Sequence, residues 1–549
     1  MDATKELVFK TKPYAHQLEV FKRFKDKEYF ALFMDMGTGK TKVAIDIASH
    51  KYIKNEINAV LIIAPNLVHL QWLNEQFIEH CAAPYIDFVW ESGKIGSRYY
   101  QASLENFASS RMHKMKVLAV NVEAFQSGTI LKYVASFLKN NKVFTIIDES
   151  TRIKTPTAKR SKAIHRISKY GCRAILTGTP ATKSPFDLWS QFEFLKPNYF
   201  GCNYFVFQHK YGVMMKGVNE HTGKSYNTLI DEKTFSIAKY KLNKLREERA
   251  LSGRSTELDN SDYEVLAAIV GISEANIRFI DAQDKFAKFK RMDELKEIIK
   301  DDVFSIKKED CLDLPAKVYE KLYVEMSKEQ KRVYKNLKNQ LKAEYGDKEL
   351  TVFNKIALTT RLMQICGGFF PYKDDDEKPK IIQIDEKKNA KIVRLKEDLE
   401  EVAPDTKIII WATYVAELKE LYETFKKDYR CALYYGATPQ HERGKIKKDF
   451  LAGKYDIFIG NPSTAGLGLN LQNATLHYFF SNSFKTEDRL QAEDRSHRIG
   501  MSKTIPCVYK DIILKGTIDE KVHEVIKMGK DINDFFKVRS LAQILDDEE

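Results

Sequence analysis

The sequence is poor in the features that mark secreted, zinc-binding and membrane-spanning proteins. Its 549 residues include only seven cysteines, and no two of them form a Cys-x-x-Cys pair. This cysteine usage favours a reducing compartment and argues against a structural zinc site. No signal peptide opens the chain, and no apolar run approaches the roughly 18 residues needed to span a bilayer. We therefore expect a cytoplasmic protein without a membrane partner.

Size and charge indicate a large enzyme rather than a small binding module. The usual length prior assigns 549 residues to roughly three or four domain-sized units, and 43% hydrophobic residues can fill their cores. The chain has 89 lysines and arginines against 76 acidic residues, which gives a net charge of +13. This balance favours a polyanionic partner such as nucleic acid, but it does not require one.

A glycine-rich turn near the N-terminus is typical of a phosphate-binding loop. It reads Met34-Asp35-Met36-Gly37-Thr38-Gly39-Lys40-Thr41 and precedes a run with helical periodicity. Glycine tolerates positive φ and lets backbone N–H groups approach an anion, here at Gly37, Thr38 and Gly39. Lys40 would reach the β- and γ-phosphates, and Thr41 would ligate magnesium. Because Met34 stands where glycine is usual, an ordinary Gly/Thr-rich turn is the alternative.

A strand with two carboxylates at its end supports the nucleotide interpretation. Residues Val143–Asp148 form an apolar run, and Glu149 follows directly. In open parallel sheets ligands bind at the carboxyl ends of the strands. We expect Asp148 to hold the magnesium shell with Thr41, and Glu149 to orient and deprotonate the attacking water. The alternative is a strand that happens to end in an acidic turn.

Short apolar runs alternate with amphipathic helical stretches in two parts of the chain, which predicts parallel, doubly wound sheets. The first set of predicted strands is Ala59–Ala64, Val117–Asn121, Val143–Asp148 and Arg173–Thr177. The second set is Val318–Glu325, Lys407–Ala412, Arg430–Tyr434, Tyr455–Gly460, Thr475–Phe480 and Ile505–Tyr509. A charged, helix-rich segment separates them. We predict an α/β fold with lobe 1 at residues 1–239, a helical insertion at 240–305 and lobe 2 with a C-terminal helix at 306–549.

An arginine-rich cluster lies in the second predicted lobe, within Gln491–Gly500. Arg495 and Arg498 are three residues apart, so they would share one helical face. Guanidinium groups stay charged, fork onto phosphate oxygens and stabilise transition-state charge. The alternative is a surface ion-pair cluster with Glu493 and Asp494.

The ordered motifs from about residue 10 to 530 resemble those of superfamily two helicase-like ATPases, and specifically of SWI/SNF-like double-stranded DNA translocases. Lys12–Gln17 resembles the Q-motif, Leu61–Phe77 motif Ia, Asp148–Lys154 motif II and Leu176–Pro180 motif III with its Leu188-Trp189 tail. Leu314–Lys317 resembles the entry to lobe 2, Ser463–Leu471 motif V and Gln491–Met501 motif VI.

This resemblance implies two RecA-like lobes that use ATP and Mg²⁺ to move along double-stranded or branched DNA. It implies nucleotide-binding roles for Gln17, Gly466, Gly468 and Gln491, and a catalytic role for Lys40, Asp148, Glu149, Arg495 and Arg498. The nucleic-acid contacts it implies are Gln71, Trp72, Arg152, Lys154, Ser463 and Thr464. For Trp72 a place in the core is the alternative. The compact form is similar to bacterial or phage-encoded members, for which protein partners are possible but unidentified.

Three departures and one segment of the insertion stand out. Besides Met34, Ser150-Thr151 replaces the usual Gly/Ala-His pair of motif II, and Leu467 replaces a motif V glycine. The segment Leu266–Ile280 has the spacing of a helix-turn-helix, with Ser273 as the cap of its second helix and Asn276 and Arg278 as candidate DNA contacts. The alternative is a two-helix hairpin that braces the lobes, with Ser273 only as a helix cap.

Three functions fit the sequence. The first is an ATP-driven double-stranded DNA translocase that remodels DNA structures, as in repair or recombination, or strips bound protein. The second is a single-strand DNA or RNA helicase, which the Leu-Thr-Gly-Thr-Pro form of motif III with its Leu-Trp tail disfavours. The third is a nucleotide-gated nucleic-acid clamp, which Glu149 and the two arginines disfavour.

Overall fold

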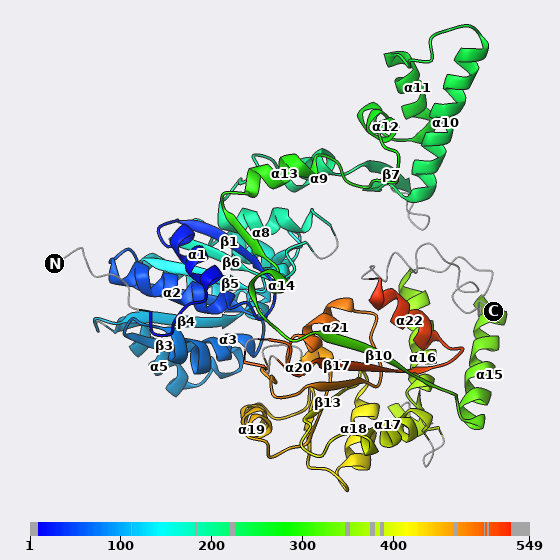
Figure 1. The fold of residues 1–549 in the computed structure, drawn as a ribbon. Helices are drawn as coiled ribbons and strands as arrows, with labels where there is room; N and C mark the ends of the chain where they lie inside the picture. Colours follow the sequence, from blue (N-terminus) through cyan, green and yellow to red (C-terminus); the bar gives the residue numbers. More distant parts are fainter. Residues whose placement is uncertain are drawn as a thin grey trace. The chain divides into compact units, whose positions relative to one another are not determined.

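The structure is a computed structural model (Figure 1) that describes most of the chain. The described residues are 9–110, 112–181, 184–218, 225–345, 352–373, 379–384, 389–465, 469–498, 500–501 and 504–528. The chain divides into two compact units. The first comprises Met1–Met34 and Lys40–Ile306, and the second comprises Asp35–Gly39 and Lys307–Glu549.

A parallel sheet of seven described strands forms the frame of the first unit. Its order is β3-β4-β2-β5-β6-β1-β9, and all neighbouring pairs run parallel. The central strands β2 and β5 are buried at every position, as expected for a sheet covered on both faces. The strands are β1 (Tyr29–Met34), β2 (Ala59–Ala64), β3 (Tyr85–Val89), β4 (Met115–Asn121), β5 (Val143–Asp148), β6 (Cys172–Leu176) and β9 (Val303–Ile306).

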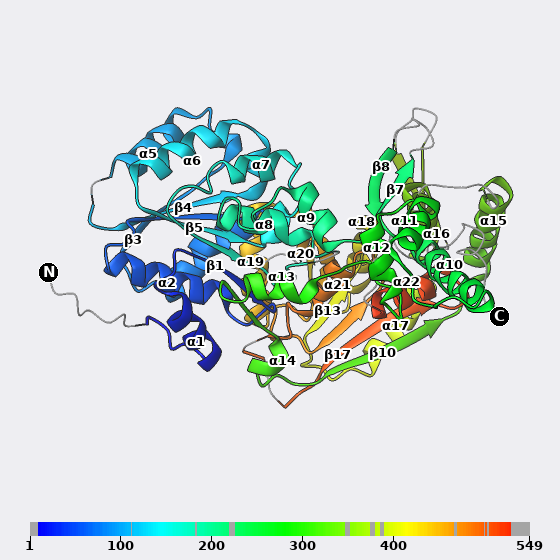
Figure 2. The same cartoon turned by 90° about the horizontal axis from the view of Figure 1, so that it is seen from above.

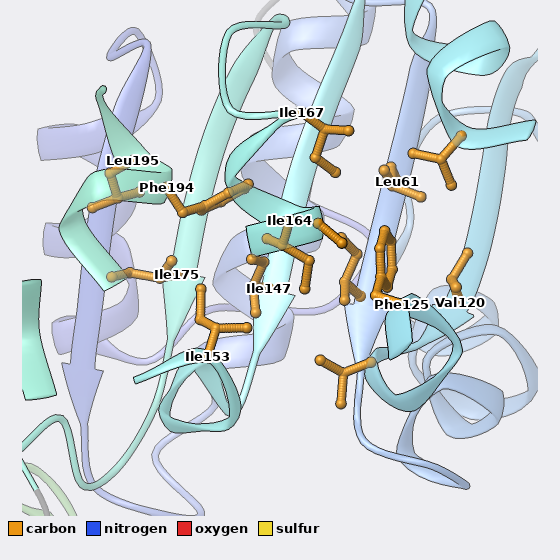
Figure 3. Packing of buried hydrophobic residues seen from close by; sticks show 14 of the residues in the cluster. Leu61, Val120, Phe125, Ile147, Ile153, Ile164, Ile167, Ile175, Phe194 and Leu195 are labelled. Carbon is orange, nitrogen blue, oxygen red and sulfur yellow. The ribbon is translucent and has the colours of Figure 1, made fainter. Parts of the chain in front are cut away.

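Helices cover both faces of this sheet. In Figure 2, α5, α6 and α7 lie on one side of it, and α1 and α2 lie on the other. Figure 3 shows the packed core of the first side, where Leu61 and Ile147 of the sheet meet Ile164 of α7. The helices of this part are α1 (Ala15–Phe24), α2 (Lys40–Ile53), α3 (Val68–Gln71), α4 (Ile78–His80), α5 (Arg98–Ser109), α6 (Thr129–Asn140), α7 (Lys159–His165), α8 (Asp187–Leu195) and α9 (Tyr204–Tyr211).

A second parallel sheet of six described strands frames the second unit, in the order β10-β17-β16-β13-β15-β14. Alternate residues of β13 enter two separate cores: Ile408 and Ile410 on one face, Ile409 and Trp411 on the other. The strands are β10 (Lys317–Val324), β13 (Ile408–Trp411), β14 (Cys431–Tyr434), β15 (Ile457–Gly460), β16 (Leu476–Phe479) and β17 (Cys507–Leu514).

The remaining elements of the second unit are mainly helices. They are α14 (Lys308–Cys311), α15 (Lys328–Tyr345), α16 (Val352–Cys366), α17 (Ala390–Glu400), α18 (Val415–Phe425), α19 (Gln440–Leu451), α20 (Pro462–Ala465), α21 (Thr486–Glu493) and α22 (Ile518–Lys527). An antiparallel hairpin joins β11 (Phe369–Lys373) to β12 (Pro379–Gln383). The two parallel sheets with helices on their faces confirm the predicted α/β class with two doubly wound lobes.

A helical segment with its own small core interrupts the first unit. It contains the antiparallel hairpin of β7 (Met214–Val218) and β8 (Ser225–Leu229), then α10 (Glu232–Leu251), α11 (Asn260–Val270) and α12 (Glu274–Asp281). Helix α13 (Met292–Ile299) follows and packs through Leu295 on the core of the first sheet. The helices therefore begin before residue 240. Strand β9 then returns to the first sheet beside β1, so the first sheet extends to Ile306, beyond the predicted end of lobe 1.

The predicted helix-turn-helix corresponds to the helices α11 and α12, each of which has one buried face. The Ser273 hydroxyl caps α12 by accepting the Asn276 N–H, as predicted. Asn276, however, is buried, donates to the Met214 carbonyl oxygen at 3.0 Å and accepts from Lys290 at 2.6 Å. Arg278 lies over the Tyr263 ring and binds Glu274. The proposed DNA contact through Asn276 is therefore wrong, because its amide is used within the segment.

Membrane insertion was not expected from the sequence. Across the part of the chain that the structure describes, no helix is both long enough and apolar enough to cross a bilayer.

Candidate nucleotide site

The phosphate loop lies between β1 and α2, and α2 begins at Lys40. Gly37 and Gly39 have φ angles of +80° and +89°, a region that residues with a Cβ adopt at a cost. The Thr38 hydroxyl closes the loop by donating to the Asp35 carbonyl oxygen at 2.7 Å. Met34 is the buried last residue of β1 and has no positive φ, which explains why this position does not need glycine.

Lys40 is mostly buried and is held by the loop itself. Its ammonium group donates to the carbonyl oxygen of Met34 at 2.6 Å. Thr41, the second residue of α2, is half-buried. The loop thus fixes a cation and a helix N-terminus at the carboxyl end of β1, which is a favourable setting for a phosphate group.

Asp148 is a buried carboxylate at the carboxyl end of β5. Its Oδ2 accepts the indole N–H of Trp72 at 2.8 Å, and its Oδ1 accepts the backbone N–H of Glu149 at 3.0 Å. Burial raises the pKa of Asp148, while the Trp72 hydrogen bond and the positive charge of Lys40 oppose that rise. The structure therefore brings Lys40 and Asp148 into electrostatic contact, as the site prediction requires.

Glu149 has a left-handed backbone, with φ +50° and ψ +56°. For a residue with a Cβ this conformation costs about 1–3 kcal/mol, and such strain concentrates at functional sites. The Thr177 hydroxyl of motif III donates to Glu149 Oε2 at 3.5 Å. Motif III therefore orients the carboxylate that was predicted to act on water.

A hydrogen-bond relay that the sequence did not reveal continues from motif II to motif III. The buried Ser150 hydroxyl donates to Gln191 Oε1 at 2.6 Å. The Gln191 amide donates in turn to the carbonyl oxygens of Pro180 at 2.7 Å and Asp187 at 2.8 Å. The Asp187 carboxylate pairs with Lys154 at 3.4 Å. Ser150 stands in place of the family's Gly/Ala. Through Gln191 and Asp187 it connects the end of β5 to Lys154, a predicted DNA contact.

Trp72 requires a correction. It was predicted as a nucleic-acid contact, but it is 1% exposed, and its N–H is bound to Asp148. It begins a π-helix, Trp72–Phe77, a rare conformation that is frequent at functional sites. The alternative of a core position is therefore right in placement, and the indole N–H is used by the Asp148 carboxylate. The neighbouring Gln71 is half-buried at the end of α3.

Three further predicted site residues, Gln17, Arg152 and Lys154, lie in the first unit. Gln17 is buried in the first turn of α1, and its Oε1 accepts the Tyr14 backbone N–H at 3.0 Å. Arg152 and Lys154 are half-buried residues just after Glu149, within and after a 3₁₀ turn, Ser150–Ile153. The roles of these side chains toward adenine and DNA stay predictions.

In the second unit, Arg495 joins motif VI to motif V. Its Nε donates to the Gln491 carbonyl oxygen at 3.0 Å, and its own carbonyl oxygen accepts the Leu471 N–H at 2.8 Å. Arg495 is mostly buried, whereas Arg498 is half-buried. This places Arg498 as the better candidate for a phosphate contact, since less of its side chain is enclosed.

The carboxylates beside these arginines pair with other cations. Glu493 binds Arg489 at 2.8 Å and Lys317 at 3.0 Å, and Asp494 pairs with Lys308. These recorded ion pairs differ from the surface cluster considered as the alternative.

The motif V residues are only partly covered by the structure. Ser463 is exposed in α20, where its N–H donates to Asn461 Oδ1 at 3.0 Å, and Thr464 is half-buried. Gly466 and Gly468, predicted to bind nucleotide, lie outside the described residues, as does Leu467.

Comparison with known families assigns the chain. Residues 20–368, more than half of the chain, match the SNF2-related domain. The chain belongs to the SNF2-related family. Residues 388–500 of this SNF2-related protein match the helicase conserved C-terminal domain. As an SNF2-related domain is an ATPase domain, the chain is a helicase-like ATPase.

The relatives of this SNF2-related ATPase are longer proteins. It is 25% identical to the ATP-dependent helicase FUN30 of Saccharomyces cerevisiae over 530 residues, which are 92% of this chain and 44% of FUN30. It is 25% identical to the uncharacterized ATP-dependent helicase MG018 of Mycoplasma genitalium over 537 residues, 95% of this chain and 42% of MG018. The chain thus spans less than half the length of these two curated relatives.

The match to one solved structure spans nearly the full length of both chains. The Sulfolobus solfataricus SWI2/SNF2 ATPase core in complex with dsDNA covers 98% of this SNF2-related chain and 97% of its own, at 20% identity and a TM-score of 0.36.

The residues of the site fit ATP and Mg²⁺. The positive-φ glycines and Lys40 suit a phosphate chain, and the buried Asp148 offers a hard oxygen ligand. No cluster of three or more acidic, histidine or cysteine ligands occurs among the residues that the structure describes. Mg²⁺ does not need one, because it is usually held by one or two protein oxygens together with substrate phosphates.

Proposed function

We propose that this SNF2-related ATPase is an ATP-driven translocase on double-stranded DNA, which remodels DNA by branch migration or by displacing strands and bound proteins. The observation that carries the proposal is the meeting of Lys40, Asp148 and Glu149 at the carboxyl edge of one parallel sheet. The family match and the ordered motifs of the second unit support it.

In the proposed reaction each residue has a separate task. Lys40 binds the β- and γ-phosphates and exchanges its hydrogen bond to Met34 for phosphate oxygens. Asp148 and Thr41 would hold Mg²⁺, which neutralises charge on the phosphate oxygens when bound. Glu149, held by Thr177, orients the attacking water and accepts its proton.

Two further sets of residues act in the proposed cycle. Arg495 and Arg498 of motif VI supply positive charge to the transition state. Lys154 and Arg152 of motif II and Ser463 and Thr464 of motif V hold the phosphate backbone. Such contacts carry no base information, so binding is sequence-independent and sensitive to salt.

The wider assignments follow from this proposal. The division into a first lobe at 1–239, a helical insertion at 240–305 and a second lobe at 306–549 stays the proposed domain arrangement. A role in repair or recombination, branched DNA as the preferred partner, and a cytoplasmic location in a bacterial or phage-infected cell are parts of the same proposal.

A panel of nucleic acids tests the proposal against its two alternatives. The rate of ATP hydrolysis is measured without nucleic acid and with duplex DNA, single-stranded DNA, branched DNA and RNA. A duplex translocase is stimulated most by duplex or branched DNA. Stronger stimulation by single strands or RNA would favour a helicase, and equal, slow turnover with every nucleic acid would favour a nucleotide-gated clamp. Lys40→Ala serves as the control, because it removes the charge that binds the phosphates.

A further inference from the structure

A hollow of about 730 Å³ opens at the amino-terminal edge of the first sheet. Its walls are the segments that lead into β2, β4 and β5, together with the last turn of α6. The phosphate loop and Asp148 lie at the carboxyl ends of strands of the same parallel sheet. Because all strands run parallel, the hollow and the ATP site lie at opposite edges of the sheet.

Among the described residues, four lysines and no aspartate or glutamate line the hollow. The lysines are Lys114, Lys116, Lys139 and Lys142. The Lys116 ammonium group donates to the Ala108 carbonyl oxygen at 2.6 Å. Lys114, Lys139 and Lys142 make no ion pair with a described residue, and their side chains are exposed. In a chain with 76 acidic residues, this is an uncompensated concentration of positive charge.

Helix dipoles account for only part of this charge. The helices α2, α5 and α6 end at the hollow, through Tyr52, Ser110 and Asn140. Each C-terminus carries roughly half a negative elementary charge, so the three together offset about one and a half of the four lysine charges. About two and a half positive charges remain for an external anion.

The walls are held in place by the backbone before any ligand binds. Asn58 Oδ1 accepts the Lys142 N–H at 2.8 Å, and the Asn58 N–H donates to the Lys142 carbonyl oxygen at 2.9 Å. The Lys116 N–H donates to the Asn58 carbonyl oxygen at 3.1 Å. One asparagine therefore fixes the segments before β4 and β5 against the start of β2. A preformed site avoids part of the entropy that ligand binding otherwise costs.

We propose that this hollow binds a compact polyphosphate anion at a site separate from the ATP site. Lysine presents a compact charge with rotatable donors and is a common ligand of phosphate groups. Its volume falls in the range of about 300–1,000 Å³ that is usual for small-ligand pockets, and a concave wall fits a small anion better than a convex duplex.

Inorganic tripolyphosphate is the probe for this site. Its binding to the full chain is measured by calorimetry with saturating ADP and excess Mg²⁺, and again in the Lys40→Ala background, so that the phosphate loop does not contribute. We expect one tripolyphosphate per chain in both settings. Absence of binding in both would overturn the proposal.

Two triple variants then locate the bound anion. Replacement of Lys114, Lys139 and Lys142 by Gln should weaken tripolyphosphate binding at least tenfold. Equal weakening in a control variant that lacks three lysines elsewhere on the surface would show a general charge effect and overturn the site. A loss of duplex DNA binding with unchanged tripolyphosphate binding would also overturn it, because the lysines would then form a nucleic-acid surface.

The control variant removes the same charge elsewhere. It replaces Lys132 on the outside of α6, Lys233 and Lys331 by Gln, and tripolyphosphate affinity should stay within twofold of wild type. All six replaced lysines are exposed, so both triple variants are expected to keep the fold.

Discussion

The hydrogen bond from the Trp72 indole to Asp148 offers the sharpest test of how the first unit positions the proposed Mg²⁺ ligand. Trp72→Phe keeps an aromatic ring in the core but removes the N–H that donates to Asp148 Oδ2 at 2.8 Å. The backbone N–H of Glu149 then remains as the recorded donor to this carboxylate, on Oδ1. A hydrogen bond to a charged group contributes about 1.5–3 kcal/mol, so the carboxylate loses orientation and stabilisation of that order.

The expected result is a change in the dependence on Mg²⁺. Groups that orient a metal ligand typically contribute about 10–100-fold to metal affinity or activity. We therefore predict that Trp72→Phe raises the Mg²⁺ concentration for half-maximal ATP hydrolysis by about 10–100-fold. The assay is steady-state hydrolysis with saturating duplex DNA and increasing Mg²⁺.

Trp90→Phe is the matched control, because Trp90 is also buried in the first unit but donates to the neutral Ser92 hydroxyl at 3.0 Å. It should lower stability without changing the Mg²⁺ dependence. An unchanged Mg²⁺ dependence in Trp72→Phe, or an equal shift in Trp90→Phe, would refute the assignment of Trp72 to the carboxylate.

Three further predictions concern other residues. Glu149→Gln should lower the turnover number by about 10²–10⁴-fold while fluorescent-nucleotide titration shows retained ATP binding, and near-wild-type turnover would remove its role as the base. Lys154→Gln should weaken duplex binding equally for all sequences and reduce the slope of log affinity against log salt by about one, whereas Asp187→Asn, which removes the negative charge paired with Lys154, should not; an unchanged slope in Lys154→Gln contradicts the contact. Burial raises the pKa of Glu417 from 4.5 to about 7, so the folded state keeps a proton that the unfolded state releases, and stability falls as pH rises through this window by on the order of 3 kcal/mol. Urea unfolding at about pH 4.5 and about pH 8 should show a loss that is smaller in Glu417→Gln than in wild type by this amount, because burial also raises the pKa of Glu420 to about 7 and this group still contributes in the variant; equal losses in both would disprove the linkage.

Much of the fold was readable from continuous apolar runs. The predicted strands Ala59–Ala64 and Val143–Asp148 coincide with β2 and β5, because both strands are buried on both faces. The same pattern in Tyr29–Met34, directly before the phosphate loop, identifies β1, which was not predicted.

Strand β9 was beyond the sequence. Its four residues, Val303–Ile306, carry a weak pattern and pair with β1, more than 260 residues earlier in the chain. A parallel pairing of this kind is decided by tertiary packing and not by local preference. This return to the first sheet places Val303–Ile306, most of which lies in the predicted insertion, beside β1 of the first unit.

The candidate site shows the same division between local and distant signals. Lys40, Asp148 and Glu149 were predicted from spacing and chemistry, and the structure brings Lys40 and Asp148 into electrostatic contact. The bond between Trp72 and Asp148 joins residues 76 positions apart, so no local pattern reveals it. The sequence signal for a core position was that an aromatic residue at the start of an amphipathic helix is more often buried than bound to a ligand, and a buried indole then needs a hydrogen-bond acceptor.

The relay through Ser150 and Gln191 was equally hidden. The departure at Ser150 was noticed as the loss of a family residue, but its hydroxyl gains a partner on α8 that only the folded chain supplies. Substitutions in a motif are therefore better judged by the contacts that the new side chain makes than by the contacts that are missing.

The central claim, movement along duplex DNA without strand separation, is tested most directly by comparing two substrates at one ATP concentration. One is a duplex carrying a third strand as a triplex, and the other is a tailed linear duplex. A duplex-tracking motor displaces the third strand, whereas opening the linear duplex requires about 1.4 kcal/mol of stacking per step without repayment. The account predicts efficient triplex displacement, absent in Glu149→Gln, with little unwinding of the tailed duplex. Efficient unwinding of the tailed duplex without triplex displacement would contradict it.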